Sequence, residues 1–132
     1  MNLRRLLHLF RQFVAWMTGP ALLVVIWGEL TPHPLPPGME NIWDKWLHFT
    51  AYFGLALMGT IALRADRRAV WWCLTMVVLG GGLEIVQSMI GRDAELGDEI
   101  ANTLGVLAGW SIAYSGIALL KSRKLVEDVK RE

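Results

Sequence analysis

Four long apolar runs, separated by short polar segments, follow one another along the chain. Each contains at most one charged residue and approaches the ~20 residues that an α-helix needs to cross a bilayer. The runs extend over Gln12–Gly28, Trp46–Leu63, Val70–Ile90 and Ile100–Leu120. With their flanking residues they predict four transmembrane helices, at about residues 12–30, 42–63, 69–90 and 98–120.

The segments around these runs have their own signatures. Thr31–Gly38 holds four prolines, which remove backbone donors and fix φ, so we expect an extended loop outside the hydrocarbon region. Met1–Gln12 carries three arginines among apolar residues and predicts an amphipathic lead-in on the membrane surface, followed by a first span bent near Gly19 and Pro20. A signal peptide is the alternative there, but the run is longer than a typical signal core and leads into no small-residue cleavage site. A basic tail occupies residues 121–132.

Composition supports a membrane protein. The 132 residues predict a single domain over 1–132, and 54% of them are hydrophobic. The mean hydropathy is +0.38. A net charge of +1, without a basic patch interleaved with aromatic residues, predicts no nucleic-acid partner. The single cysteine, Cys73, excludes an internal disulfide and a cysteine-based metal cage.

The distribution of Lys and Arg predicts the orientation. If the N-terminus, the turn at residues 64–68 and the C-terminal tail share one side, that side holds 11 of the 13 Lys and Arg residues. The opposite side then holds only Lys45 and Arg92. By the positive-inside rule, the basic side is cytoplasmic. The predicted fold is therefore an all-α protein of the plasma membrane: four transmembrane helices in an up-down bundle, with both termini cytoplasmic.

A cluster of polar residues is expected at the outward end of this bundle. Glu84 lies within an apolar run, where a carboxylate costs about 2.5–3.5 kcal/mol and is rarely kept without a partner or a role. Helical spacing and short loops bring polar faces of the second, third and fourth helices together. The candidate binding residues are Asp44, Lys45, His48, Tyr52, Glu84, Gln87, Arg92, Asp98 and Asn102. Close helix packing is expected at Gly80, Gly105 and Gly109, the last two in a GxxxG spacing.

The order of these residues resembles the VanZ-like family of small bacterial membrane proteins. The resemblance is carried by Asp44-Lys45-x-x-His48-Phe49-x-Ala51-Tyr52-Phe53, Glu84-x-x-Gln87, Arg92, Asp98, Ala101-Asn102, Gly105 and Gly109. The founding member of that family is associated with low-level resistance to the glycopeptide teicoplanin. The resemblance thus implies a role at the cell envelope similar to glycopeptide resistance, and it implies no particular reaction.

The preferred functional prediction is a binding site for an anionic or amphiphilic envelope molecule. Membrane lipids surround the bundle, and the ligand would be a lipid-linked cell-wall precursor or a glycopeptide. Arg92, Lys45 and His48 would contact phosphate or carboxylate groups. Glu84 and Asn102, with Gln87, would read hydroxyl or amide groups. This prediction includes no cofactor and no metal, and it is compatible with an oligomer.

Three alternatives use the same residues. In an intramembrane hydrolase or transferase, Glu84 and His48 would act as general acid and base, with a metal held by His48, Glu84 and Asp98 as the hydrolytic variant. In a transporter, Glu84 would carry protons, although four short helices leave little room for alternating access without oligomerisation. In the third alternative, the cluster serves only to lock the packing of the helices.

Overall fold

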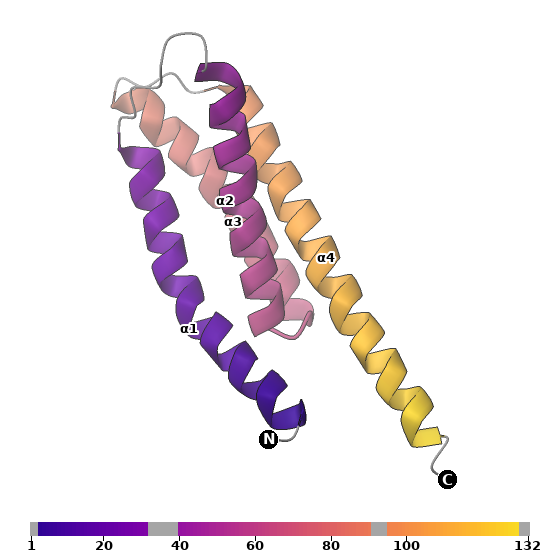
Figure 1. Ribbon diagram of the computed structural model, residues 1–132. Helices are drawn as coiled ribbons and strands as arrows, with labels where there is room; N and C mark the ends of the chain where they lie inside the picture. Colours follow the sequence, from indigo (N-terminus) through magenta and orange to yellow (C-terminus); the bar gives the residue numbers. More distant parts are fainter. Residues whose placement is uncertain (1–2, 32–39, 91–94, 130–132) are drawn as a thin grey trace.

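The described part of the chain forms four helices, and successive helices run antiparallel to one another. The computed structural model describes residues 3–31, 40–90 and 95–129. The helices are α1 (Leu3–Leu30), α2 (Glu40–Ala62), α3 (Arg67–Met89) and α4 (Leu96–Val129). The chain runs alternately up and down, so both termini lie at the same end of the bundle (Figure 1). This arrangement agrees with the helix order and the up-down topology predicted from the apolar runs.

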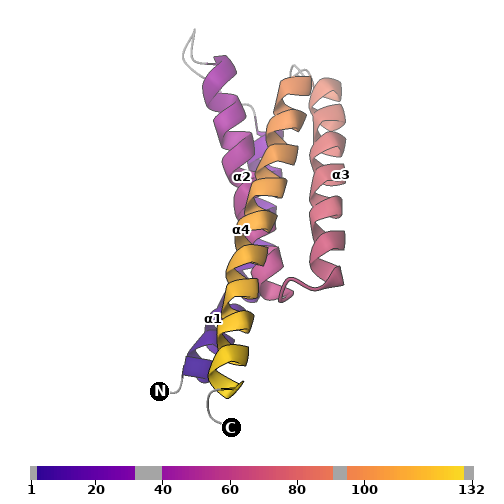
Figure 2. The same ribbon diagram turned by 90° about the vertical axis from the view of Figure 1, so that its right-hand side faces the viewer.

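Two helices are longer than the sequence predicted. The expected surface lead-in is continuous with the first span, because α1 begins at Leu3 and includes Pro20. The helix is bent along its length (Figure 1). At the other end of the chain, α4 continues to Val129, through most of the expected tail, and extends past the turn between α2 and α3 (Figure 2). The expected proline loop lies, apart from Thr31, outside the described residues.

The second helix, α2, is the centre of the bundle. It contacts each of the other three helices and packs most extensively on α4. Glycines make this contact close: a methyl group at Gly105 would meet the carbonyl oxygen of Phe49, and one at Gly109 would meet that of Phe53. The apolar core beneath is formed by Tyr52, Leu55, Ala56, Cys73, Met76 and Val106. The predicted GxxxG packing therefore joins the backbones of α2 and α4.

Three helices, α1, α3 and α4, are long and apolar enough to span a membrane. Large apolar side chains on them point away from the bundle, including Trp16, Val78 and Leu104. The sequence predicted four such helices, but α2 does not meet the same measure of length and hydropathy within the described residues. The reason is composition, because α2 is as long as α3, with 23 residues, but Asp44, Lys45 and His48 in its first half lower its hydropathy.

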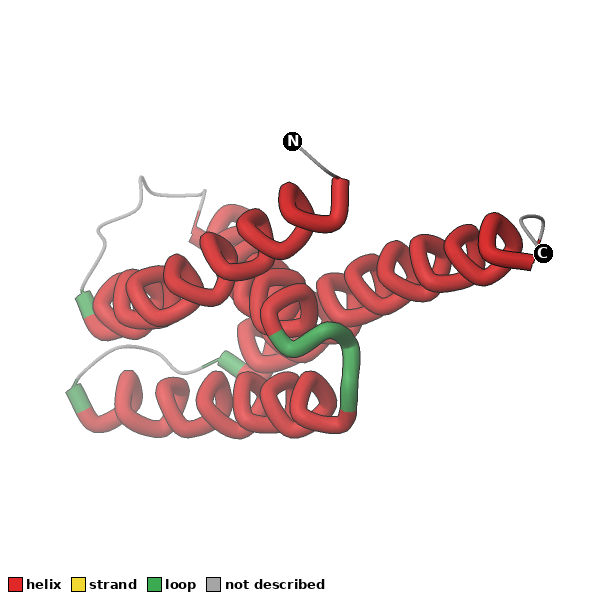
Figure 3. The backbone as a smooth tube through the Cα atoms, turned by 90° about the horizontal axis from the view of Figure 1, so that it is seen from below, coloured by secondary structure: helices red, strands yellow, loops and turns green. Residues whose placement is uncertain are grey.

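The end that carries the termini is basic. The N-terminal part of α1 and the C-terminal part of α4 lie apart there (Figure 3), and both helices, with the end of α2, line a groove of about 860 Å³. Apolar side chains line most of the groove, and its basic residues are Arg4, Arg11, Arg64, Lys121 and Arg123, together with His8. At the same end, Asp66 caps α3 by accepting a hydrogen bond of 2.8 Å from the backbone N–H of Arg68. Its hydrogen bonds with Arg68 lower the pKa of the Asp66 carboxyl below its ordinary value.

Candidate functional site

A buried polar cluster occupies the end of the bundle opposite the termini, and all four helices contribute to it. The end of α1, the start of α2, the end of α3 and the start of α4 meet there (Figure 1). The buried polar residues at this end are Glu29, His48, Glu84, Gln87, Asp98 and Asn102. Asp44 and Lys45 are half-buried beside them, and Tyr52 lies fully buried below. The structure thus gathers the predicted binding residues, except Arg92, which lies outside the described residues.

His48 is the centre of the cluster. Its side chain is 5% exposed, and its Nδ1 lies 3.1 Å from Oδ1 of Asn102 and 3.6 Å from Oε1 of Glu29. The Asn102 amide nitrogen faces the other way and donates a hydrogen bond of 3.4 Å to Glu99. Both neighbours of Nδ1 are therefore oxygen acceptors, so Nδ1 carries a proton. The other ring nitrogen, Nε2, faces Asp44, whose Oδ1 lies 4.0 Å away.

Glu29, on the last turn of α1, is a site residue that the sequence analysis did not include. Its side chain accepts a hydrogen bond of 3.4 Å from the Tyr52 hydroxyl. Its backbone carbonyl accepts one of 2.8 Å from Nε2 of Gln87. Glu29 therefore ties α1 to both α2 and α3. The available signal was a carboxylate directly after the charge-free apolar run that ends at Gly28.

Glu99 is a second acidic residue that was not predicted. It is half-buried on the first turn of α4, and its carboxylate accepts hydrogen bonds of 3.4 Å from both Asn102 and Thr103. Gly80 on α3 faces it, because a methyl group there would lie 2.8 Å from Oε2 of Glu99 and 2.9 Å from Nδ2 of Asn102. Gly80 therefore leaves space for polar side chains rather than for a backbone contact. The sequence signal for Glu99 was its i, i+3, i+4 spacing with Asn102 and Thr103, which places the three side chains on one helix face.

Glu84 lies inside the bundle, with 7% of its surface exposed. Neither of its carboxylate oxygens accepts a hydrogen bond within 3.5 Å from the part of the chain that the structure describes. The charges of His48, Asp98 and Glu29 act on Glu84 electrostatically, as does the backbone N–H of Glu95. Helical spacing in the sequence predicted that the polar faces converge on Glu84. The structure instead centres the hydrogen-bond network on His48 and places Glu84 beside it.

The mouth of the cluster carries an ion-pair network. The Lys45 ammonium nitrogen lies 2.7 Å from Oε2 of Glu95 and 3.5 Å from Oδ1 of Asp98. Asp98 is the buried member, with a side chain that is 4% exposed. The aliphatic part of the Lys45 side chain packs against Gly97. A methyl group at Gly97 would lie only 2.6 Å from Cε of Lys45, so the glycine leaves the space that this side chain needs.

Comparisons of the chain with protein-family models, with curated proteins and with solved structures gave no match. The resemblance to the VanZ-like family accordingly rests on the motif residues of the sequence.

The charge balance determines which ligands the cluster suits. Its described carboxylates are Glu29, Asp44, Glu84, Glu95, Asp98 and Glu99, against the cationic side chain of Lys45 and the imidazole of His48. Lys45 and His48 both already contact carboxylate oxygens. The site therefore offers mainly hydrogen-bond acceptors and negative charge. Such a site suits ligands that donate hydrogen bonds, or a cation.

Proposed function

We propose that the protein is a four-pass protein of the plasma membrane, with both termini cytoplasmic and the polar cluster on the outer side. The positions of the charges support this topology. Arg4, Arg11, Arg64, Lys121 and Arg123 gather at the end with the termini, whereas Lys45 is the cation described at the opposite end. A cytoplasmic position of the basic end follows from the positive-inside rule.

In this topology α2 is the fourth span. It has 23 residues, the same number as α3. Three of its polar residues, His48, Tyr52 and Thr60, face the other helices rather than the surroundings, since they are buried. A central helix can carry polar groups through a membrane when neighbouring helices provide their partners.

The polar cluster binds the head group of a cell-envelope molecule, such as a lipid-linked cell-wall precursor or a glycopeptide. The observation that carries this proposal is the Glu84 carboxylate, which is 7% exposed and has no hydrogen-bond partner among the described residues. A buried acceptor without a donor costs free energy, which a ligand hydroxyl or amide would recover. The anionic part of the same ligand would stay outside the acidic cluster, and Arg92, in the segment that follows α3 in the sequence, would be its cationic contact. The resemblance to VanZ-like proteins supports the same setting at the cell envelope and a role similar to glycopeptide resistance.

A second candidate function is hydrolysis or group transfer at the same site. The specific observation in its favour is the oriented imidazole of His48, whose Nδ1 is held by Asn102 and whose Nε2 is directed toward Asp44. An imidazole held through one nitrogen is the usual arrangement of a general base. Glu84 would then be the second proton-transfer group.

A measurement of ligand binding distinguishes both functions from a cluster that only holds the helices together. The purified chain in lipid nanodiscs would be titrated with a lipid-linked disaccharide-peptide precursor, and separately with teicoplanin. We expect saturable binding of at least one probe, weakened tenfold or more by Glu84→Gln and by Arg92→Ala. Asp66→Asn, at the opposite end of the bundle, is the matched control and should bind as the wild type does. Unchanged binding in both site variants would exclude this function, and release of a product from the bound probe would favour the enzyme.

A further inference from the structure

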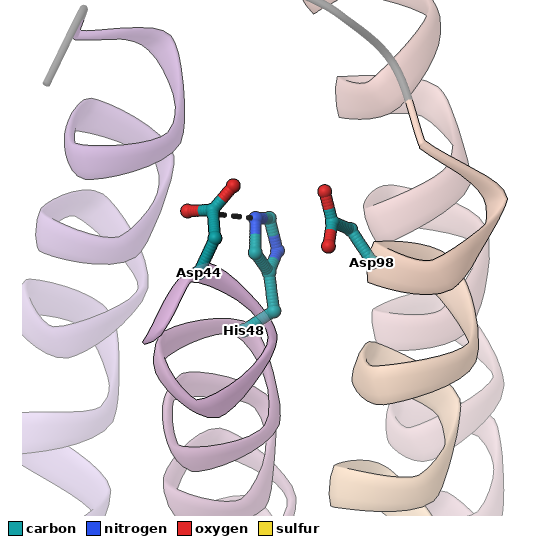
Figure 4. A group of neighbouring side chains, drawn as sticks. All are labelled: Asp44, His48 and Asp98. Atoms are coloured by element: carbon teal, nitrogen blue, oxygen red, sulfur yellow. Dashed lines mark ion pairs between the residues drawn. The ribbon is translucent and has the colours of Figure 1, made fainter. Parts of the chain in front are cut away.

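Three side chains with metal-ligating atoms face one small space inside the polar cluster. Asp44 and His48 lie one helical turn apart on α2, and Asp98 faces them from the first turn of α4. One potential ligand atom from each residue lies within 4.8 Å of the other two. Figure 4 shows the imidazole lying between the two carboxylates. Ligands of one Zn²⁺ ion lie about 2.0–2.2 Å from it, and therefore at most about 4.4 Å from one another, so small side-chain rotations would close this group on an ion.

The orientation of His48 fits a metal ligand. Histidines that bind metals generally donate their other ring N–H to a carboxylate or carbonyl oxygen, which fixes the tautomer and aims the ring. His48 has this arrangement, because Nδ1 lies 3.1 Å from Oδ1 of Asn102 and 3.6 Å from Oε1 of Glu29. Nε2 is thereby directed toward the neighbouring carboxylate of Asp44, and loss of its proton would provide the lone pair that binds a metal. Asn102, Glu29 and Glu99 form the outer hydrogen-bonding groups that such a site needs.

Two buried carboxylates, Asp98 in this group and Glu84 beside it, have oxygens that accept no hydrogen bond from the described part of the chain. Oδ1 of Asp98 accepts no hydrogen bond from the described part of the chain, and its contact with the Lys45 ammonium is 3.5 Å, longer than the 2.7 Å between Lys45 and Glu95. Glu84 is 7% exposed, and its charge acts on both His48 and Asp98. A charged group is kept in a protein interior when it is paired or coordinates a metal. A divalent cation would supply the positive charge that the cluster lacks, and Lys45 would keep Glu95.

We propose that Asp44, His48 and Asp98 form a binding site for a divalent transition-metal ion, with Nε2 of His48 and one carboxylate oxygen from each aspartate as ligands. One nitrogen and two oxygen ligands suit Zn²⁺ or Mn²⁺, whereas Ca²⁺ and Mg²⁺ prefer oxygen ligands alone. The remaining coordination positions would face Glu84 and the mouth of the cluster. This ligand set differs from the one considered in the sequence analysis, because Asp44 takes the place of Glu84. The site stands on these contacts and does not depend on the envelope ligand proposed above.

The test is metal binding by the full chain, purified without a histidine tag and stripped with a chelator. Titration calorimetry with Zn²⁺ and Mn²⁺ should show one ion bound per chain at micromolar or lower dissociation constants. His48→Gln and Asp98→Asn should each weaken binding tenfold or more. Asp66→Asn is the matched control, because it removes a carboxylate at the opposite end of the bundle, where Asp66 caps α3, and it should bind normally. Absence of saturable binding of both ions, or binding that is unchanged in His48→Gln, would overturn the proposal.

A spectroscopic measurement keeps the test valid if the site variants do not fold. The chain with both His8→Gln and His33→Gln retains His48 as its only imidazole. Pulsed electron paramagnetic resonance of bound Mn²⁺ in this variant should show coupling to one imidazole nitrogen. A spectrum with bound Mn²⁺ but no nitrogen coupling would also overturn the proposed site.

Discussion

The imidazole Nδ1 of His48 on α2 lies 3.1 Å from the side-chain oxygen of Asn102 on α4. Asn102 is fully buried, and its amide nitrogen donates to Glu99 one turn earlier on α4. This amide therefore determines which nitrogen of His48 carries the proton and joins the two most closely packed helices. In a membrane, where the driving force from apolar burial between helices is small, such hydrogen bonds fix helix register.

Substitution of Asn102 tests this relationship. Asn102→Ala removes both hydrogen bonds, and we expect it to lower the free energy of unfolding by about 1–2 kcal/mol. Asn102→Asp should destabilise more, because it places a second carboxylate beside Glu99 and removes the donor to it. Unfolding of the purified protein in mixed micelles would measure both. Ser115→Ala, at an exposed position on the same helix, is the control. An Asn102→Asp variant as stable as the wild type would contradict the assigned amide orientation.

The glycines of α4 give a second prediction, about helix packing. Gly105→Ala and Gly109→Ala each place a methyl group against a backbone carbonyl of α2. The backbone of a packed helix cannot move aside as easily as the end of a flexible side chain. We expect each substitution to destabilise the protein by about 1–3 kcal/mol, as overpacking commonly does. The measurement is the midpoint of thermal unfolding.

Gly116→Ala is the matched control for these substitutions. A methyl group at Gly116, on the same helix, meets nothing within 4 Å. Because alanine favours the helix over glycine by about 1 kcal/mol, Gly116→Ala should be neutral or stabilising. Equal effects at Gly105 and Gly116 would show that the close contact between α2 and α4 is absent.

Much of this architecture could be predicted from the sequence, because the length and spacing of apolar runs determine helix number and order. The convergence of His48, Asp98 and Asn102 also follows from helical spacing and short connections. The role of Glu29 could not be predicted, since it depends on how α1 packs against α2 and α3, which no periodicity in α1 encodes. The start of α1 at Leu3 was missed because arginines interrupt its apolar pattern, although they do not interrupt a helix.

The position of Asp66 before α3 predicts a pH dependence of stability. Hydrogen bonds from Arg68 lower the pKa of Asp66 in the folded protein below its ordinary value of 3.8, so the ionised form favours folding. This contribution is fully present above the unfolded pKa and is lost as the pH falls through the lower folded pKa. The wild type should therefore be more stable than Asp66→Asn at pH 6, and the difference should shrink toward pH 3. Thermal unfolding of both proteins across this range would measure it. A difference that stays constant with pH would assign the effect to the capping geometry and not to the charge.

Glu84 and Glu29 provide the sharpest prediction, because the same substitution should change stability in opposite directions. Glu29→Gln weakens the contact with His48 and alters the acceptor of the Tyr52 hydroxyl, and we expect a loss of about 1–3 kcal/mol. Glu84→Gln removes a buried carboxylate without a hydrogen-bond partner among the described residues. The neutral amide is less costly to bury, so the metal-free protein should gain about 1 kcal/mol. Residues kept for binding are commonly destabilising in this way.

The comparison requires chelator-treated protein and no added ligand, since either partner would stabilise the wild type by mass action. The free energies of unfolding of the wild type and the two variants in the same micelles then report only the contributions of the two carboxylates. If Glu84→Gln is destabilised as strongly as Glu29→Gln, the Glu84 carboxylate stabilises the helix packing. The proposal that this carboxylate is kept for binding a ligand would then be wrong. A stabilised Glu84→Gln that has also lost probe binding would link the cost of burying this acid directly to the function of the site.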